Sequence, residues 1–284
     1  MMDLGSGPDA TGDRGGRPPL VVGLGSSAGE LQALQDFLRG VPEGSGAALI
    51  LLVQIDASGP GLLSGLSMAA RLPVVEAADG TPIQEDHIYS VPARSVVSLQ
   101  DGVLRLAPCE RPEDQRAALD RFLYSLARDQ GERAVAVILS GPGSDGALGL
   151  KAVSEAGGMT LVQDPATARQ DAMPQSALAT GAVDRVLPPG ELAAELVAYA
   201  RHLREAVQGE GEQPLRDQVE GALPSICEVL LQATGHNFRH YKNSTLVRRT
   251  LRRTQVLRLG SAREYLERLR ADPAEVQQLF KDML

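Results

Sequence analysis

A serine lies in a glycine-rich turn near the start of the sequence. Residues 25–29 read GSSAG, which fits the G-x-S-x-G pattern of a nucleophile elbow, a sharp turn between a strand and a helix that exposes a serine hydroxyl. The β-branched residues Val21 and Val22 precede the turn, and apolar residues at helical spacing follow it from Leu31. Ser27 is therefore a candidate nucleophile.

Two other interpretations fit the same turn. Residues 23–28 (GLGSSA) loosely match a dinucleotide fingerprint, in which glycines let a pyrophosphate approach the backbone. A tight strand-to-helix connection that binds no ligand would also use such glycines. Short glycine patterns often match by chance, so the turn alone leaves the three interpretations open.

A second glycine-rich turn carries a carboxylate. Residues 134–139 (AVAVIL) are a continuous apolar run, typical of a strand buried on both faces, and residues 140–146 (SGPGSDG) follow it. In parallel sheets, sites form at the carboxyl ends of the strands. We therefore expect Ser27 and Asp145 to meet there. The alternative role for Asp145 is to cap a helix beside Gly146.

The order of the elements predicts an α/β fold. Apolar, strand-like runs alternate with amphipathic helices, which is typical of a doubly wound, mainly parallel sheet with helices on both faces. A small all-α helical domain is expected to follow, because the pattern becomes helical throughout. We divide the chain into a disordered leader (1–18), the α/β domain (19–205), a linker (206–217) and the helical domain (218–284).

The formal net charge of −8 conceals an uneven distribution. Residues 225–284 hold 11 Lys and Arg against 6 Asp and Glu, a net of +5, and the remainder holds 17 against 30, a net of −13. This asymmetry favours two bodies with different partners. Aromatic residues make up 3% and Trp is absent, which argues against a stacking platform for nucleic acid.

Composition also predicts where the protein resides. The sequence has no apolar run long enough to span a membrane, so we expect no membrane insertion. Cys109 and Cys227 are far apart and have no metal-ligand spacing, so we expect no metal site. Two such thiols fit a reducing, cytoplasmic location.

Several stretches, in order, resemble one protein family. The sequences VVGLGSSAGELQAL, SGPGSDGALGLKAV, QDPATARQDAMPQSAL and ATGAVDRVLP closely resemble the chemotaxis receptor protein-glutamate methylesterases of the CheB type. The later stretch ATGHNFRHYKNSTLVRRTLRR resembles the N-terminal helical domain of CheR-type protein-glutamate methyltransferases. The chain looks most like the variant in which the two are fused, and the resemblance covers about residues 18–284. It implies phosphorelay signalling in chemotaxis and the hydrolysis of γ-methyl esters on receptor glutamates.

The resemblance implies a Ser–His–Asp triad. Its motifs place the nucleophile at Ser27 and the orienting carboxylate at Asp145, roles that this chemistry requires together with an imidazole base. The residues implied to form the oxyanion site and its turns are Ser26, Ala28, Gly29 and Gly143.

The triad histidine is missing from its expected place. The family carries it in a V-Q-H-type motif after the second strand, whereas residues 53–56 here read VQID, so Ile55 holds the position or the position is deleted. No histidine lies between Ser27 and His87, and a structural role suits His87 better than rescue of the triad. Pro142 also lacks the backbone N–H that in this family helps to bind the oxyanion. We therefore expect impaired hydrolysis.

The helical domain carries a basic helix. The resemblance implies that it docks on acidic receptor helices, and the expected partner-binding residues are Arg248, Arg249, Arg252 and Arg253. A solvated charged face is the ordinary alternative. The sequence stops before a methyltransferase catalytic domain, so no cofactor is expected in this chain. S-adenosylmethionine would be used only if that domain is present elsewhere.

Three hypotheses about function follow. The first is a chemotaxis-type adaptation protein whose methylesterase-like domain acts on methyl-accepting receptors or related sensor proteins, with impaired hydrolysis. The second is a non-catalytic module that binds receptors or sensor kinases on an esterase frame. The third is a nucleotide-binding domain, which is weakened because no acidic residue lies about 20 residues beyond the glycines, at the end of the second strand.

Overall fold

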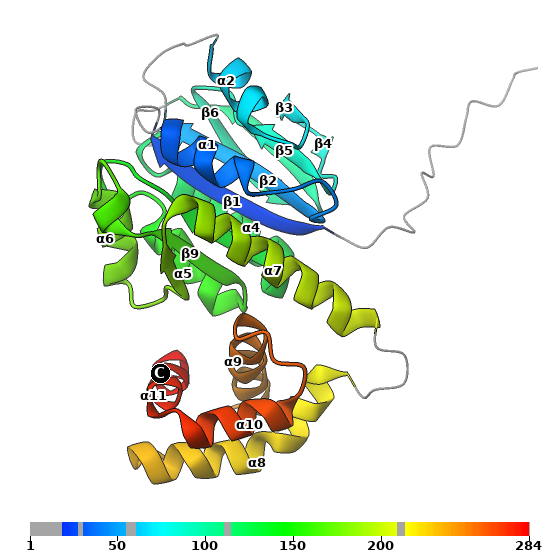
Figure 1. The fold of residues 1–284 in the computed structure, drawn as a ribbon, viewed down its shortest axis with the longest axis vertical. Coiled ribbons are helices and arrows are strands. Elements are labelled where there is room, and N and C mark those ends of the chain that lie inside the picture. Colours follow the sequence, from blue (N-terminus) through cyan, green and yellow to red (C-terminus); the bar gives the residue numbers. More distant parts are fainter. Residues whose placement is uncertain (1–18, 28–30, 55–60, 111–114, 209–213, 284) are drawn as a thin grey trace, which may run out of the picture.

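A seven-stranded parallel sheet forms the centre of the first domain (Figure 1). The computed structural model describes residues 19–27, 31–54, 61–110, 115–208 and 214–283, and the predicted leader lies outside them. The strand order is β10-β9-β8-β1-β2-β5-β3, and each neighbouring pair is parallel. The strands are β1 (Leu20–Ser27), β2 (Ala47–Gln54), β3 (Val74–Glu76), β5 (His87–Ser90), β8 (Ala134–Ile138), β9 (Met159–Gln163) and β10 (Arg185–Leu187).

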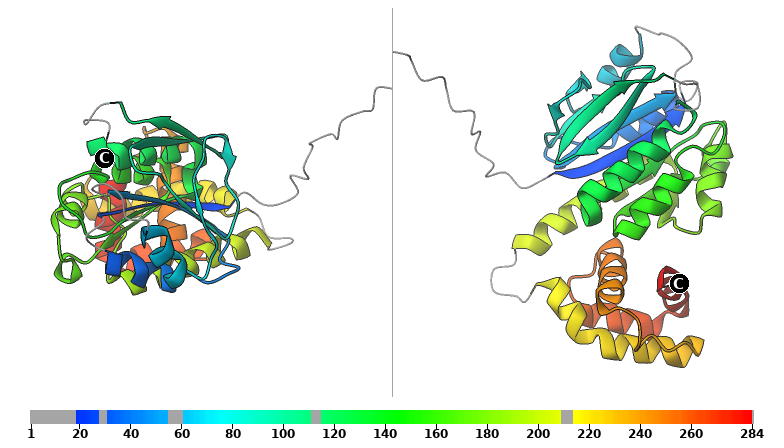
Figure 2. Two further views of the ribbon diagram at one scale, coloured as in Figure 1. Left: turned by 90° about the horizontal axis from the view of Figure 1, so that it is seen from above. Right: turned by 180° about the vertical axis from the view of Figure 1, so that it is seen from behind.

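Helices cover both faces of this sheet (Figure 2). On one face, α1 (Leu31–Arg39) and α7 (Pro189–Gln208) pack over one apolar core, and α2 (Gly61–Ala69) lies beside α1. On the other face, α4 (Ala118–Gln130), α5 (Ala147–Ala156) and α6 (Ala172–Ala179) enclose a second core. The predicted doubly wound α/β class is confirmed.

A hairpin packs beside α4 on the second face. Its strands β6 (Ser95–Gln100) and β7 (Val103–Pro108) pair antiparallel, and β4 (Thr81–Pro82) joins them as a third strand. At the turn, Asp101 and Gly102 have φ of 51° and 72°, the left-handed values that two-residue hairpin turns require. An Asp-Gly pair thus forms the kind of turn that such hairpins favour.

Four helices form the second domain. They are α8 (Leu215–Thr234), α9 (Asn243–Val256), α10 (Ala262–Ala271) and α11 (Pro273–Met283), and they share an apolar core of their own. The predicted linker at 206–217 overlaps the end of α7 and the start of α8. No helix within the described residues is both long and apolar enough to cross a membrane.

A buried cluster of charges joins the two domains. Asp184, in the turn before β10, accepts hydrogen bonds from Arg252 (2.7 Å) and Arg253 (3.3 Å) of α9. These three side chains are at most 6% exposed. The Nε of Arg252 also donates to the carbonyl oxygen of Gly158, just before β9, at 2.9 Å. Helix α9 is thereby bound to the edge region of the sheet.

Two acidic side chains of α11 complete the cluster. Glu275 accepts hydrogen bonds from Nε and Nη2 of Arg253 at 3.0 and 2.6 Å, and Asp282 accepts one from Arg252 at 3.2 Å. Burial raises the pKa of Asp282, although the charge of Arg252 acts in the opposite direction. Two guanidinium groups thus share three carboxylates, and each has an acidic partner on α11 besides Asp184. The cluster therefore holds the two domains in one arrangement.

The Asp184→Asn variant tests this contact. It replaces an oxygen that accepts from buried guanidinium groups by an amide NH₂, and we expect a loss of about 1–3 kcal/mol in the free energy of unfolding, measured by urea denaturation. Asp171→Asn is the matched control, because Asp171 is exposed and its side chain makes no capping hydrogen bond. A loss for Asp184→Asn no larger than that of the control would contradict the role assigned to the cluster.

Candidate functional site

The predicted nucleophile lies at the carboxyl end of the central strand. Ser27 is the last residue of β1, pairs with Gln54 at the end of β2, and is 7% exposed. Its N–H donates to the carbonyl oxygen of Ser140 at 3.1 Å. In the sheet, β1 lies between β2 and β8, and the order of the strands reverses between β1 and β8. Doubly wound sheets bind ligands at such a switch point, beyond the carboxyl ends of the strands.

The neighbouring serine has a structural contact. The Ser26 hydroxyl, 1% exposed, donates to the carbonyl oxygen of Ser140 at 3.3 Å. This bond ties the end of β1 to the turn after β8, and the oxyanion or turn role of Ser26 stays a prediction. Ala28, Gly29 and Ile55, which the sequence assigned to the oxyanion site and to the lost histidine position, lie outside the described residues.

The carboxylate of Asp145 binds the start of helix α4. Its Oδ2 accepts the N–H of Leu119 at 3.1 Å, and its Oδ1 accepts the N–H of Asp120 at 2.9 Å. The first N–H groups of a helix lack partners within the helix, so the carboxylate supplies acceptors that they need. Asp145 is thus a helix cap, but for α4 and not for α5, which follows it and begins after Gly146.

None of the four histidines of the chain lines the pocket beside this turn. His87 begins β5 and pairs with Ala48, six residues along β2 from the partner of Ser27. At about 3.3 Å per residue, this places His87 about 20 Å from Ser27, at the amino ends of the parallel strands. The remaining histidines lie on α7 or in the helical domain: His202, His236 and His240.

Two glycines of β1 allow helix α4 to pack closely against the strand. A Cβ at Gly23 would lie 2.6 Å from the side chain of Leu123, and one at Gly25 would overlap the side chain of Leu119. Both leucines belong to α4, so the absent side chains allow α4 to approach the sheet closely. Helix packing therefore accounts for glycine at these two positions without a bound dinucleotide.

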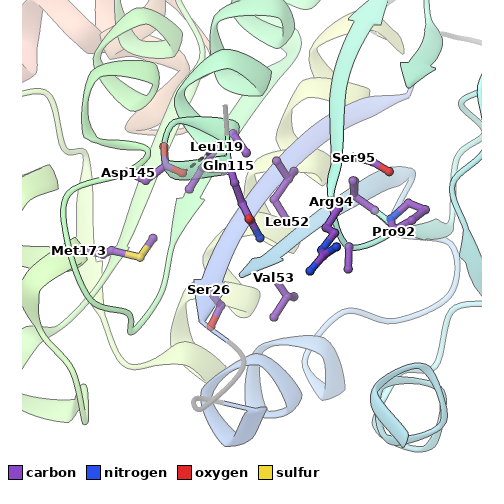
Figure 3. Close-up of a pocket in the computed structure, with 13 residues that line it drawn as sticks. Ser26, Leu52, Val53, Pro92, Arg94, Ser95, Gln115, Leu119, Asp145 and Met173 are labelled. Carbon is purple, nitrogen blue, oxygen red and sulfur yellow. Dashed lines mark hydrogen bonds between the residues drawn. The ribbon is translucent and has the colours of Figure 1, made fainter. Parts of the chain in front are cut away.

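A small pocket opens at the carboxyl ends of β1 and β2 (Figure 3). It encloses about 50 Å³, well below the roughly 300–1,000 Å³ of sites that bury whole small-molecule ligands. Leu52, Val53, Leu119 and Met173 supply apolar lining. As bounded by the described residues, the pocket suits a side-chain group better than a nucleotide.

The polar lining includes two residues that the sequence analysis missed. Arg94 and Gln115 join Ser26 and Asp145 around the pocket, and Figure 3 shows both projecting toward the end of β2. Arg94 lies four residues beyond the end of β5, so its place after a parallel strand was the available signal. Ser27 is not among the described lining residues.

The turn after β8 holds the remaining predicted residues. Gly143 is exposed at φ 82°, and its carbonyl oxygen accepts a long hydrogen bond from the Ser176 hydroxyl at 3.4 Å. The N–H of Gly141 donates to the carbonyl oxygen of Gln170 at 2.9 Å. Between these glycines, Pro142 has no N–H to offer to an oxyanion. The predicted oxyanion role of Gly143 stays a prediction.

The arginines of α9 do not form one exposed face. Arg252 and Arg253 are 2% and 5% exposed and bind carboxylates of their own chain. Arg248 is half-buried, and Arg249, also half-buried, reaches the carbonyl oxygen of Ser154 on α5 at 3.5 Å. This burial corrects the expectation of a solvent-facing basic surface at Arg252 and Arg253. Partner binding by Arg248 and Arg249 stays a prediction.

Comparison with known proteins shows which family the chain belongs to. Residues 22–196 match the CheB methylesterase family. The chain belongs to that family. Residues 222–284 match the all-alpha domain of CheR methyltransferases. The crystal structure of the Thermotoga maritima CheB methylesterase catalytic domain matches with a TM-score of 0.58 at 26% identity, covering 63% of this chain and 97% of that one. The family resemblance inferred from the sequence is confirmed.

Two relatives show how much of a longer protein the chain spans. A 104.1 kDa protein in the hypE 3′ region of Rhodobacter capsulatus is 35% identical over 242 residues, which are 78% of this chain and 25% of that protein. Protein-glutamate methylesterase/protein-glutamine glutaminase 2 of Anaeromyxobacter dehalogenans is 37% identical over 185 residues, or 65% of this chain and 54% of that protein. The chain spans a quarter of the first and about half of the second.

The Asp145→Asn variant tests the helix-capping role. The new amide NH₂ faces one N–H of α4, so that N–H loses its acceptor. We expect a loss of about 1–3 kcal/mol in the free energy of unfolding, measured in urea. Ser27→Ala is the control and should stay within about 0.5 kcal/mol of wild type, because the Ser27 hydroxyl has no hydrogen bond to another described residue. Equal stability of the two variants would refute the capping role.

Proposed function

We propose that the chain acts in chemotaxis-type receptor adaptation, with a CheB domain that binds glutamyl segments of receptors and hydrolyses their γ-methyl esters slowly or not at all. The observation that carries the proposal is the lack of an imidazole near Ser27: none of the four histidines of the chain lines the pocket, and His87 begins β5, at the amino end of the strands.

The chemistry explains why such a site is impaired. A serine hydroxyl attacks an ester carbonyl only when a base takes its proton, and a positioned general base contributes about 10²–10⁴ in rate. Pro142 removes a further oxyanion donor, and losing one such donor costs about 10²–10³. Both deficits affect the transition state more than ground-state binding. The domain can therefore keep its partner after losing most of its rate.

Receptor partners are part of the proposal. Relatives such as that of Anaeromyxobacter dehalogenans carry the name protein-glutamate methylesterase, and we assign the same substrate class, protein glutamates, to this chain. The modified receptor segments would be its targets, or those of related sensor proteins. We place the protein in the cytoplasm as part of the same proposal.

Release of methanol from a methyl-esterified receptor fragment tests the proposal. We expect the wild-type rate to lie within about tenfold of that of Ser27→Ala, because an unactivated hydroxyl forgoes the general-base contribution. Ile55→His should restore only part of the activity, since Pro142 still offers no N–H. His87→Ala is the control and should leave the rate unchanged, because His87 lies at the amino ends of the strands, away from Ser27.

The opposite pattern would refute the impairment. Wild-type turnover that Ser27→Ala lowers by more than about 10²-fold, the range of general-base catalysis, would mean that another group activates the serine. A matching loss in His87→Ala would identify that group.

A further inference from the structure

The pocket beside Ser26 contains a cation without a partner among the described residues. Arg94 forms no hydrogen bond or ion pair through its guanidinium with any of them, and the Gln115 amide likewise forms none. By contrast, Arg252 and Arg253 bind carboxylates of the chain. Figure 3 shows Arg94 and Gln115 directed into the same space, above Val53.

The backbone holds Arg94 in place. Its φ is 59°, a left-handed value that is uncommon for a residue with a side chain and that occurs preferentially at functional sites. Two hydrogen bonds support the turn: the N–H of Cys109 donates to the carbonyl oxygen of Arg94 at 2.7 Å, and the N–H of Ser95 donates to that of Pro92 at 3.3 Å. These contacts fix the backbone of Arg94, and its exposed side chain extends from the turn toward the pocket.

The rest of the pocket suits a small anion. Its walls include Leu52, Val53 and Leu119, which lower the local polarity and strengthen a charged hydrogen bond. The other charged group among the described lining residues is Asp145, whose two oxygens accept N–H groups at the start of α4. The positive end of that helix offsets its charge. A negatively charged guest therefore meets Arg94 as its principal partner.

We propose that this pocket binds the free side-chain carboxylate of a receptor glutamate, through Arg94 and Gln115, in preference to its methyl ester. A guanidinium fork matches the two oxygens of a carboxylate, and such charge-assisted bonds are about twice as strong as neutral ones. An ester or a primary amide offers one carbonyl oxygen and no charge. On this proposal, which rests on the receptor partner proposed above, the domain recognises demethylated glutamate.

Binding of three synthetic peptides tests the preference. They share one receptor-derived sequence and carry Glu, Gln or the γ-methyl ester of Glu at the modified position, and their affinities for the full chain are measured by fluorescence anisotropy. We expect the Glu peptide to bind at least about tenfold more tightly than the other two. The Arg94→Met variant should abolish this difference, and Arg94→Lys should keep part of it, because it keeps the charge but not the fork.

Two controls make the result decisive. Arg105→Ala removes an exposed arginine of β7 that does not line the pocket, and it should leave the preference unchanged. Circular dichroism of each variant shows whether it is folded. Equal affinity for the Glu and Gln peptides, a preference that survives Arg94→Met, or no binding of any peptide would overturn the proposal.

The same samples separate this proposal from the proposed function. Methanol released from the ester peptide at a rate that Ser27→Ala lowers by more than about 10²-fold would show an active esterase and refute the impairment. The Glu and Gln affinities are also compared in the Ser27→Ala background, because relatives are named protein-glutamine glutaminases and an active site could convert the Gln peptide to Glu. That comparison decides the carboxylate preference whatever the esterase result.

Discussion

The close contact between α4 and β1 is the constraint on which the site depends. Gly23 and Gly25 have no side chains to keep the helix away, so Leu119 and Leu123 pack directly on the central strand. Asp145 then binds the first N–H groups of the helix from the neighbouring turn. One arrangement thus closes the core, places Gln115 and Leu119 at the pocket and engages the carboxylate that a triad would need.

The contact between the domains has a comparable effect on the basic helix. The charge asymmetry of the sequence suggests two domains with different partners. Some of the opposite charges, however, pair with each other between the two domains. Asp184 of the acidic domain binds Arg252 and Arg253 of the basic domain, and Glu275 and Asp282 balance the same guanidinium groups. A buried cluster of this kind favours one geometry over others more than it adds stability. It aligns the helical domain with β9 and the edge strand β10.

Local patterns predicted the frame well. The apolar run of β8 and the alternation of strand-like runs with amphipathic helices each act over a few residues, so a single sequence contains the information. The roles of charged side chains were harder to predict. Asp145 binds N–H groups about 25 residues away along the chain, and helical spacing gives Arg252 the same pattern whether its face meets water or a carboxylate. Arg94 belongs to no recognisable motif, and only the fold places it in the same pocket as Ser26.

The reactivity of Ser27 toward a fluorophosphonate tests the central claim most directly. Such a reagent modifies a serine hydroxyl only when a neighbouring base takes its proton, and mass spectrometry locates the label without any need for a receptor. The account predicts that Ser27 stays unmodified in the wild-type chain under conditions in which an intact serine esterase is labelled completely. Stoichiometric labelling of Ser27 would contradict it, because a base would then be serving a site whose described lining residues include no histidine.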